Sequence, residues 1–132
     1  MDEAAREAVR QRAGGRCEYC LLPEAHVVIP FHVEHVIAKQ HRGRDTLRNL
    51  AYACHRCNLH KGPNLTGIDP KSGKLVRLFN PRRHSWGRHF RWEGAVLIGR
   101  TAVGRATVDV LAMNDPARAA LRQELLDQGL LF

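Results

Sequence analysis

Residues 54–62 read Cys54-His-Arg-Cys57-Asn58-Leu-His60-Lys61-Gly62, and they decide the fold together with an earlier cysteine pair. The chain has four cysteines, and both pairs have the spacing Cys-x-x-Cys. A two-residue gap lets both thiolates of a tight turn face one ion, so two such turns can complete the tetrahedral shell that zinc prefers. We therefore predict a structural zinc site whose ligands are Cys17, Cys20, Cys54 and Cys57.

Two other uses of these cysteines are less consistent with the sequence. Disulfides are disfavoured because the N-terminal residues lack a charged-then-apolar export signal, and cytosolic thiols stay reduced. A redox dithiol would need only one pair, in a thioredoxin-like βαβ setting. The zinc site is thus the preferred interpretation, although it says little about function because zinc knuckles occur in enzymes and binding modules alike.

The residues between the two cysteine pairs predict a ββα unit. Residues 31–37 alternate apolar and polar side chains over most of their length, as a strand does. A polar loop containing Gly43 follows over residues 38–48, and residues 50–54 form a short second strand. Residues 55–61 fit a helix that ends at Gly62.

Further elements are expected on both sides of this unit. Residues 3–13 have helix-forming composition with Asp2 as N-cap, and residues 75–79 and 95–99 suit strands. Residues 101–113 show apolar positions at helical spacing, and Asp115-Pro116 is a typical start for a last helix closed by Gly129. With 132 residues, the chain suits one compact α+β domain, residues 1–132.

The ββα unit carries a second ordered set of residues that bears on chemistry. It consists of Glu34-His35-Val36-Ile37, then Asn49-Leu50, then the Cys54 segment quoted above. Over about residues 15–62 this pattern closely resembles the HNH endonuclease family, in the branch whose ββα-metal motif is braced by two zinc knuckles. The separations from His35 to Asn49, fourteen positions, and from Asn49 to Asn58, nine positions, fit that family. The resemblance implies a zinc-braced ββα-metal core, with a mixed α/β extension over residues 63–132.

The resemblance also implies a role for each matching residue. A neutral imidazole can take a proton from water near pH 7, and His35 is the matching general base. Glu34 and the side-chain oxygen of Asn58 match the ligands of a catalytic Mg²⁺ or another divalent ion such as Mn²⁺ or Ni²⁺. Asn49 would hydrogen-bond loop backbone and so orient the base. The 3′-oxygen would leave, giving 5′-phosphate ends.

Three positions depart from the family pattern, and none removes a catalytic group. Glu34 replaces the commoner Asp, Ala38 stands where a Pro often follows, and Arg44 replaces a second loop glycine. The longer side chain of Glu34 is expected to shift the metal geometry, and Arg44 could add a phosphate contact. Supporting roles at the metal site or on substrate phosphate are considered for His32, His41, His60 and Lys61, with an ordinary surface position as the equal alternative.

The net charge of +8 favours an anionic partner, and its distribution is uneven. Residues 71–105 hold nine Lys and Arg against one Glu, whereas residues 1–70 hold ten against eight Asp and Glu. We expect nucleic-acid contacts from Arg44, Lys71, Lys74, Arg77, Arg82, Arg83, Arg88 and Arg91. Trp86, Phe90 and Trp92 lie among these basic residues and could stack on bases, but we prefer to place them in the core.

The sequence thus predicts a cytoplasmic, metal-dependent endonuclease that hydrolyses phosphodiester bonds of double-stranded DNA by nicking or double-strand cleavage. A homodimer would suit a double-strand cut. A non-catalytic zinc-knuckle module would explain the cysteines and the charge, but it leaves the spacing of Glu34, His35, Asn49 and Asn58 as coincidence. A nuclease acting on structured RNA is the other alternative.

Overall fold

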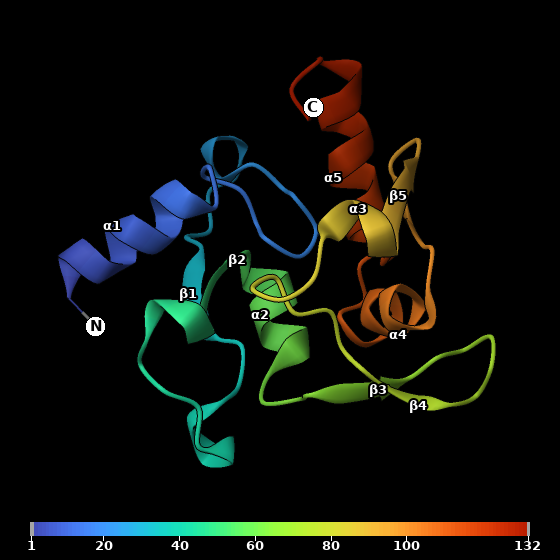
Figure 1. Ribbon diagram of the computed structural model, residues 1–132. Coiled ribbons are helices and arrows are strands. Elements are labelled where there is room, and N and C mark those ends of the chain that lie inside the picture. The colour runs from blue at the N-terminus through green and yellow to red at the C-terminus, as the bar shows by residue number, and fades with distance from the viewer. Residues whose placement is uncertain (1, 132) are drawn as a thin grey trace.

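The structure is a computed structural model that describes residues 2–131. Its first half begins with helix α1 (Glu3–Arg12), in which the Asp2 side chain accepts a hydrogen bond from the Ala5 amide at 2.7 Å. Strands β1 (His32–His35) and β2 (Leu50–Ala53) form an antiparallel hairpin that pairs His35 with Leu50. Helix α2 (His55–Lys61) follows and packs against β1 (Figure 1). The predicted ββα unit is therefore present.

The second half is built from two hairpins around helix α4 (Ala102–Val110). Strands β3 (Thr66–Ile68) and β4 (Leu75–Arg77) form one hairpin; β5 (Phe90–Glu93) and β6 (Val96–Gly99) form the other. Helix α4 contacts both hairpins and the short helix α3 (Trp86–His89). Helix α5 (Pro116–Asp127) is the last helix and runs beside β5 in Figure 1, with the Arg122 guanidinium 5.7 Å from the centre of the Trp92 ring.

Close contacts fix how α4 packs. A methyl group added at Gly104 would lie 2.0 Å from the carbonyl oxygen of His89, so only glycine lets the helix approach this closely. The Arg105 guanidinium donates to both carboxylate oxygens of Asp69, at 2.8 and 2.9 Å, which ties α4 to the turn after β3. Asp69 is fully buried, so this ion pair forms part of the interior.

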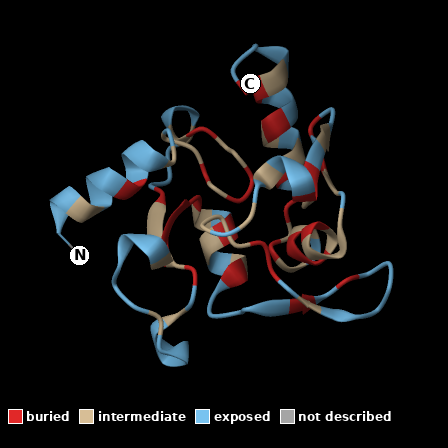
Figure 2. Ribbon diagram, viewed as in Figure 1, coloured by how far each residue is buried: buried red, intermediate tan, exposed pale blue. Residues whose placement is uncertain are grey.

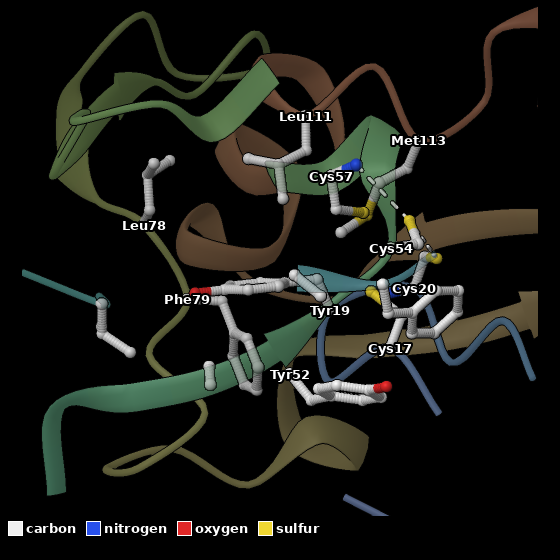
Figure 3. Packing of buried hydrophobic residues seen from close by; sticks show 14 of the residues in the cluster. Cys17, Tyr19, Cys20, Tyr52, Cys54, Cys57, Leu78, Phe79, Leu111 and Met113 are labelled. Atoms are coloured by element: carbon white, nitrogen blue, oxygen red, sulfur yellow. Dashed lines mark hydrogen bonds between the residues drawn. The ribbon is translucent and has the colours of Figure 1, made fainter. Parts of the chain in front are cut away.

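A single cluster of buried apolar side chains includes residues from both halves. In Figure 3, Tyr19 and Tyr52 lie beside the cysteines, Phe79 packs against the Tyr19 ring, and Leu111 and Met113 lie above Cys57. Buried positions lie along β2, the inner side of α2 and α4, whereas α1 is largely exposed (Figure 2). Phe90 is buried, and the Trp86 indole N–H donates to the Tyr19 carbonyl at 2.8 Å. Phe90 therefore belongs to the core, as we preferred, and Trp86 and Trp92 are partly buried against it.

Most predicted elements are found with ends shifted by a few residues. The strands expected at residues 31–37 and 75–79 are shorter, since the structure gives His32–His35 and Leu75–Arg77. Strand β3 was not predicted, because Thr66–Ile68 shows no alternation and contains glycine. Within residues 2–131 no helix combines the length and apolar character that a membrane span requires.

Candidate metal centre and active site

Four cysteine sulfurs converge between the two halves of the chain. All four are buried, and their Sγ atoms lie within 4.8 Å of one another. The Cys20 and Cys54 sulfurs are 3.7 Å apart, close to the edge of about 3.8 Å that Zn–S bonds of about 2.3 Å give a tetrahedron. In each pair the second cysteine's amide donates to the first cysteine's sulfur, at 3.4 Å in both. The cluster is compatible with a structural zinc ion.

Helix α5 supplies a cation to this cluster. The Arg118 guanidinium donates to the Cys57 sulfur at 2.9 Å and contacts the Cys54 sulfur at 3.8 Å. A second nitrogen of the same guanidinium donates to the Leu111 carbonyl at 2.6 Å, so two hydrogen bonds in different directions fix the orientation of this group. Four thiolates around Zn²⁺ would carry a net negative charge, and Arg118 is placed to balance part of it.

His35, the expected base, lies at the end of β1 beside a carboxylate. Its Nε2 atom is 2.5 Å from Oδ1 of Asp45, and the His35 side chain is 22% exposed. The hydrogen bond with His35, followed by that with Lys39, holds the pKa of Asp45 below its ordinary value. An ionised Asp45 accepts the hydrogen of Nε2, which leaves the Nδ1 lone pair free in the neutral ring. The sequence analysis did not include Asp45, because an aspartate in a polar loop has many ordinary roles.

Asn49 fixes the loop that carries Asp45. Its side-chain oxygen accepts from the Ile37 amide at 2.9 Å, and its nitrogen donates to the carbonyls of Ile37 at 3.0 Å and Arg44 at 2.9 Å. These are bonds to loop backbone of the kind expected for this residue. Gly43 lies against the same point: a methyl group there would be 1.6 Å from the Ile37 oxygen. Both ends of the loop are therefore held together next to His35.

Glu34, the expected metal ligand, has partners on both carboxylate oxygens. The Tyr19 hydroxyl donates to Oε1, and the Lys61 ammonium lies 3.3 Å from Oε2. Glu34 is 6% exposed and Lys61 is 2% exposed. Burial raises the pKa of Glu34, whereas Lys61 and Tyr19 act in the opposite direction by favouring the ionised form. The Lys61 ammonium also donates to the Val36 carbonyl at 2.9 Å.

This arrangement corrects one expectation. Lys61 was considered as a contact for substrate phosphate, but its burial and its bonds to Glu34 and Val36 direct the ammonium into the interior. The physical reason lies in the helix spacing, because Lys61 is one turn beyond Cys57 and shares its buried side. Lys61 therefore stabilises the buried carboxylate instead of binding substrate.

The remaining candidates come from β1, the loop after it and α2. Asn58 is half-buried on α2. His32 shares a strand face with Glu34, but its Nε2 is 3.1 Å from Nδ1 of His55, so its partner is another histidine. His41 is exposed in the loop, and His60 is half-buried on α2. Among residues 2–131, the four cysteines are the one group of three or more His, Cys, Asp or Glu gathered closely enough to hold an ion.

The basic residues of the middle segment divide among several surfaces. Lys71, Lys74 and Arg77 are exposed on the β3–β4 hairpin, whereas Arg88 and Arg91 are exposed on α3 and β5. Arg44 is exposed in the loop after His35. Arg82 and Arg83 line a cleft with Arg12 and Arg48, two arginines that our sequence analysis did not select.

The fold and the cysteine cluster are consistent with an HNH-type α+β fold. Residues 17–64 match the family model described as HNH endonuclease. It contains both cysteine pairs, Glu34, His35, Asn49 and Asn58, which supports nuclease activity and metal binding at the level of the family. No match was found among curated proteins, and none among solved structures.

Proposed function

We propose that the protein is a metal-dependent endonuclease that hydrolyses phosphodiester bonds of double-stranded DNA, with His35 as the general base. The observation that carries the proposal is the pairing of His35 Nε2 with Asp45 at 2.5 Å, beside a loop held by Asn49. A base needs a free lone pair and a fixed orientation, and an ionised Asp45 provides both by binding the opposite ring nitrogen. Asp45 is then a positioning residue for His35.

The proposed reaction is a hydrolysis. His35 Nδ1 takes a proton from water while the water oxygen bonds to phosphorus. The bond between phosphorus and the 3′-oxygen breaks with its electron pair on the oxygen, which takes up a proton from solvent water to give the 3′-hydroxyl; the other product carries the 5′-phosphate. Asn49 contributes by keeping the loop, and with it Asp45, in place beside the imidazole.

Glu34 and Asn58 are the proposed ligands of the catalytic divalent ion, with Mg²⁺, Mn²⁺ and Ni²⁺ as candidates. Both side chains offer the oxygen donors that hard divalent ions prefer. Lys61 and Tyr19 favour the ionised form of Glu34 against the effect of burial, and a ligand carboxylate has to be ionised. When bound, such an ion relieves the negative charge of the phosphate and stabilises the leaving oxygen.

We assign the four cysteines to zinc with a purely structural role. Their closed, buried arrangement leaves no side for a substrate, as in tetrahedral structural sites. The zinc ion would hold the loop before β1 to the start of α2, and the catalytic ion would be separate.

The test is a plasmid nicking assay. Supercoiled DNA is incubated with wild-type protein and Mg²⁺, Mn²⁺ or Ni²⁺, and with His35→Ala, Asp45→Asn and the control His26→Ala. His26 is exposed and lies outside the loop, so His26→Ala should nick like wild type. We expect His35→Ala to be inactive and Asp45→Asn to be slower. Failure of the wild type with every metal, or full activity of His35→Ala, would end the catalytic proposal.

A second function is favoured by one specific observation: both Glu34 oxygens already have partners inside the protein. If Lys61 serves as the permanent counter-ion of Glu34, the chain is a zinc-braced nucleic-acid-binding module without hydrolysis. Duplex binding without nicking under any metal would establish this alternative. A labelled structured RNA in a parallel assay separates a ribonuclease from a deoxyribonuclease.

A further inference from the structure

A cleft lined almost entirely by arginine lies beside the ββα unit. It has a volume of about 610 Å³, and its lining is Arg12, Arg48, Pro81, Arg82 and Arg83. Arg12 is the last residue of α1, and Arg48 lies in the short 3₁₀ turn that ends at Asn49. Segments far apart in the sequence therefore bring four guanidinium groups to one cleft.

Little negative charge inside the protein balances this cleft. Of its four arginines, Arg82 has a carboxylate partner, Glu18. The Arg12 guanidinium donates to the carbonyls of Leu47 at 2.8 Å and Leu50 at 2.5 Å, and within residues 2–131 it forms no direct ion pair with a carboxylate. Glu18 offsets part of its charge through space. The pKa of Arg12 is lowered, because burial and then the nearby charge of Arg82 disfavour the protonated form. The cleft is thus strongly electropositive.

One nitrogen of Arg82, an arginine that lines this cleft, is buried but has no hydrogen-bond acceptor. Nη1 of Arg82 is buried without a hydrogen bond, and within residues 2–131 it is the one buried side-chain nitrogen or oxygen in this state. A buried donor left unpaired costs about 1–3 kcal/mol, and more when charged. A water or an ion that the structure does not contain is one explanation for such an atom. Because Arg82 lines the cleft, an anion bound there would be placed to supply the partner.

The position of the cleft connects it with the candidate active site. Arg12 binds the carbonyl of Leu50, the residue that pairs with His35 across the hairpin. Arg48 directly precedes Asn49, whose side chain holds the loop beside His35. A nucleic-acid strand that brings one phosphate to His35 could therefore continue along the cleft.

We propose that this cleft binds backbone phosphates of a DNA strand next to the phosphate that is cut. Planar guanidinium groups bind phosphate oxygens in pairs, and several of them along one cleft suit a chain of phosphates. The choice of DNA rests on the proposed function, whereas the choice of a phosphate rests on the cleft itself.

The experiment measures duplex binding without cleavage. His35→Ala protein is titrated into a fluorescent DNA duplex at several salt concentrations, without added divalent ion, and anisotropy gives the binding constant. Each neutralised phosphate contributes about 0.9 to the slope of log K against log salt. We expect the further changes Arg48→Gln and Arg83→Gln to reduce that slope by about 1 each, and by about 2 together.

The matched control is Arg100→Gln, which removes one charge from an exposed arginine outside the cleft. It should leave the slope unchanged. Arg48 and Arg83 are exposed and their side chains bond to no residue within 2–131, so the variants should melt like the parent. An unchanged slope in the double variant, or an equal loss in Arg100→Gln, would overturn the proposal.

A second arm separates a nucleic-acid strand from free phosphate. Inorganic phosphate is added to the same proteins, and thermal stabilisation is recorded. Stabilisation by phosphate that the double variant abolishes, with no change in the DNA slope, would assign the cleft to free phosphate and refute the strand. The binding experiment uses His35→Ala protein, so its result does not depend on cleavage. The nicking assay therefore tests the proposed function, and the salt slope tests the cleft.

Discussion

Replacing Gly43 by alanine should both destabilise the protein and inactivate it. The new methyl group would lie 1.6 Å from the Ile37 oxygen, 2.6 Å from the Ile37 carbon and 2.9 Å from Nδ2 of Asn49. Restoring ordinary contact requires the backbone to move by roughly 1.5 Å or more. That shift breaks the two hydrogen bonds between Asn49 and Ile37, worth about 0.5–1.5 kcal/mol each, and adds about 1–3 kcal/mol of overpacking.

The expected total of about 2–6 kcal/mol corresponds to a fall in Tm of roughly 8–24 °C for a chain of this size. The control is Gly87→Ala: no neighbouring atom lies within 4 Å, and alanine in helix α3 should be neutral or stabilising. Circular dichroism melts measure both changes. Nicking by Gly43→Ala should fall about 100-fold, since a displacement near 1 Å can cost that much. A Tm of Gly43→Ala within about 2 °C of wild type would refute the reasoning, whatever the activity of the variant. This threshold is small beside the expected fall in Tm.

Three further predictions test other contacts. Arg118→Gln should release zinc to a chelating dye with a 10- to 100-fold loss of affinity, because a cation beside the thiolates is removed; unchanged release contradicts this. Asp69→Asn should destabilise the protein, because hydrogen bonds from Arg105 hold the pKa of Asp69 well below its usual range. That stability is present above the unfolded pKa of about 3.9 and is lost as pH falls through the folded value, so the difference in Tm between wild type and variant should shrink in acid; a constant difference argues against it. Lys61→Met should cost about 3–5 kcal/mol in urea unfolding, because the buried Glu34 carboxylate loses its cationic partner and keeps the Tyr19 hydroxyl alone on its other oxygen; Glu34→Gln in the same chain should recover part of the loss.

The features that the sequence predicted well depend on near neighbours. The bounds of α2 follow from Cys54 at its N-terminus and Gly62 at its end, and α5 begins at the expected Asp115-Pro116. Cysteine spacing within each pair is equally local, because two residues fix the turn that aims both sulfurs. The family pattern then related the two pairs, and the structure brings all four sulfurs together.

The contacts that the sequence did not predict join residues whose partners are set by tertiary packing. Asp45 reaches His35 because Asn49 folds the loop back, and no local pattern separates this aspartate from other polar loop residues. Arg118 reaches the cysteines from 61 positions beyond Cys57. Lys61, the partner of Glu34, was likewise not predicted as buried. A lysine after Cys-x-x-Cys suggests a surface residue, and only the structure shows that it lies on the buried side of the helix.

Net charge by segment does not by itself identify the arginines of the cleft, because pairing decides which charges remain available. Arg105 counts toward the excess of residues 71–105, yet Asp69 binds its guanidinium through two oxygens. Arg12 and Arg48 belong to a nearly balanced segment, but within the described chain neither has a carboxylate partner, and both line the same cleft. A surface potential is the sum of charges after such pairs are removed, so arginines from an almost neutral segment can add to a positive cleft beside arginines from the basic one. If this reasoning holds, the salt dependence of DNA binding will follow Arg48 more closely than Arg105, although only Arg105 lies in the basic segment.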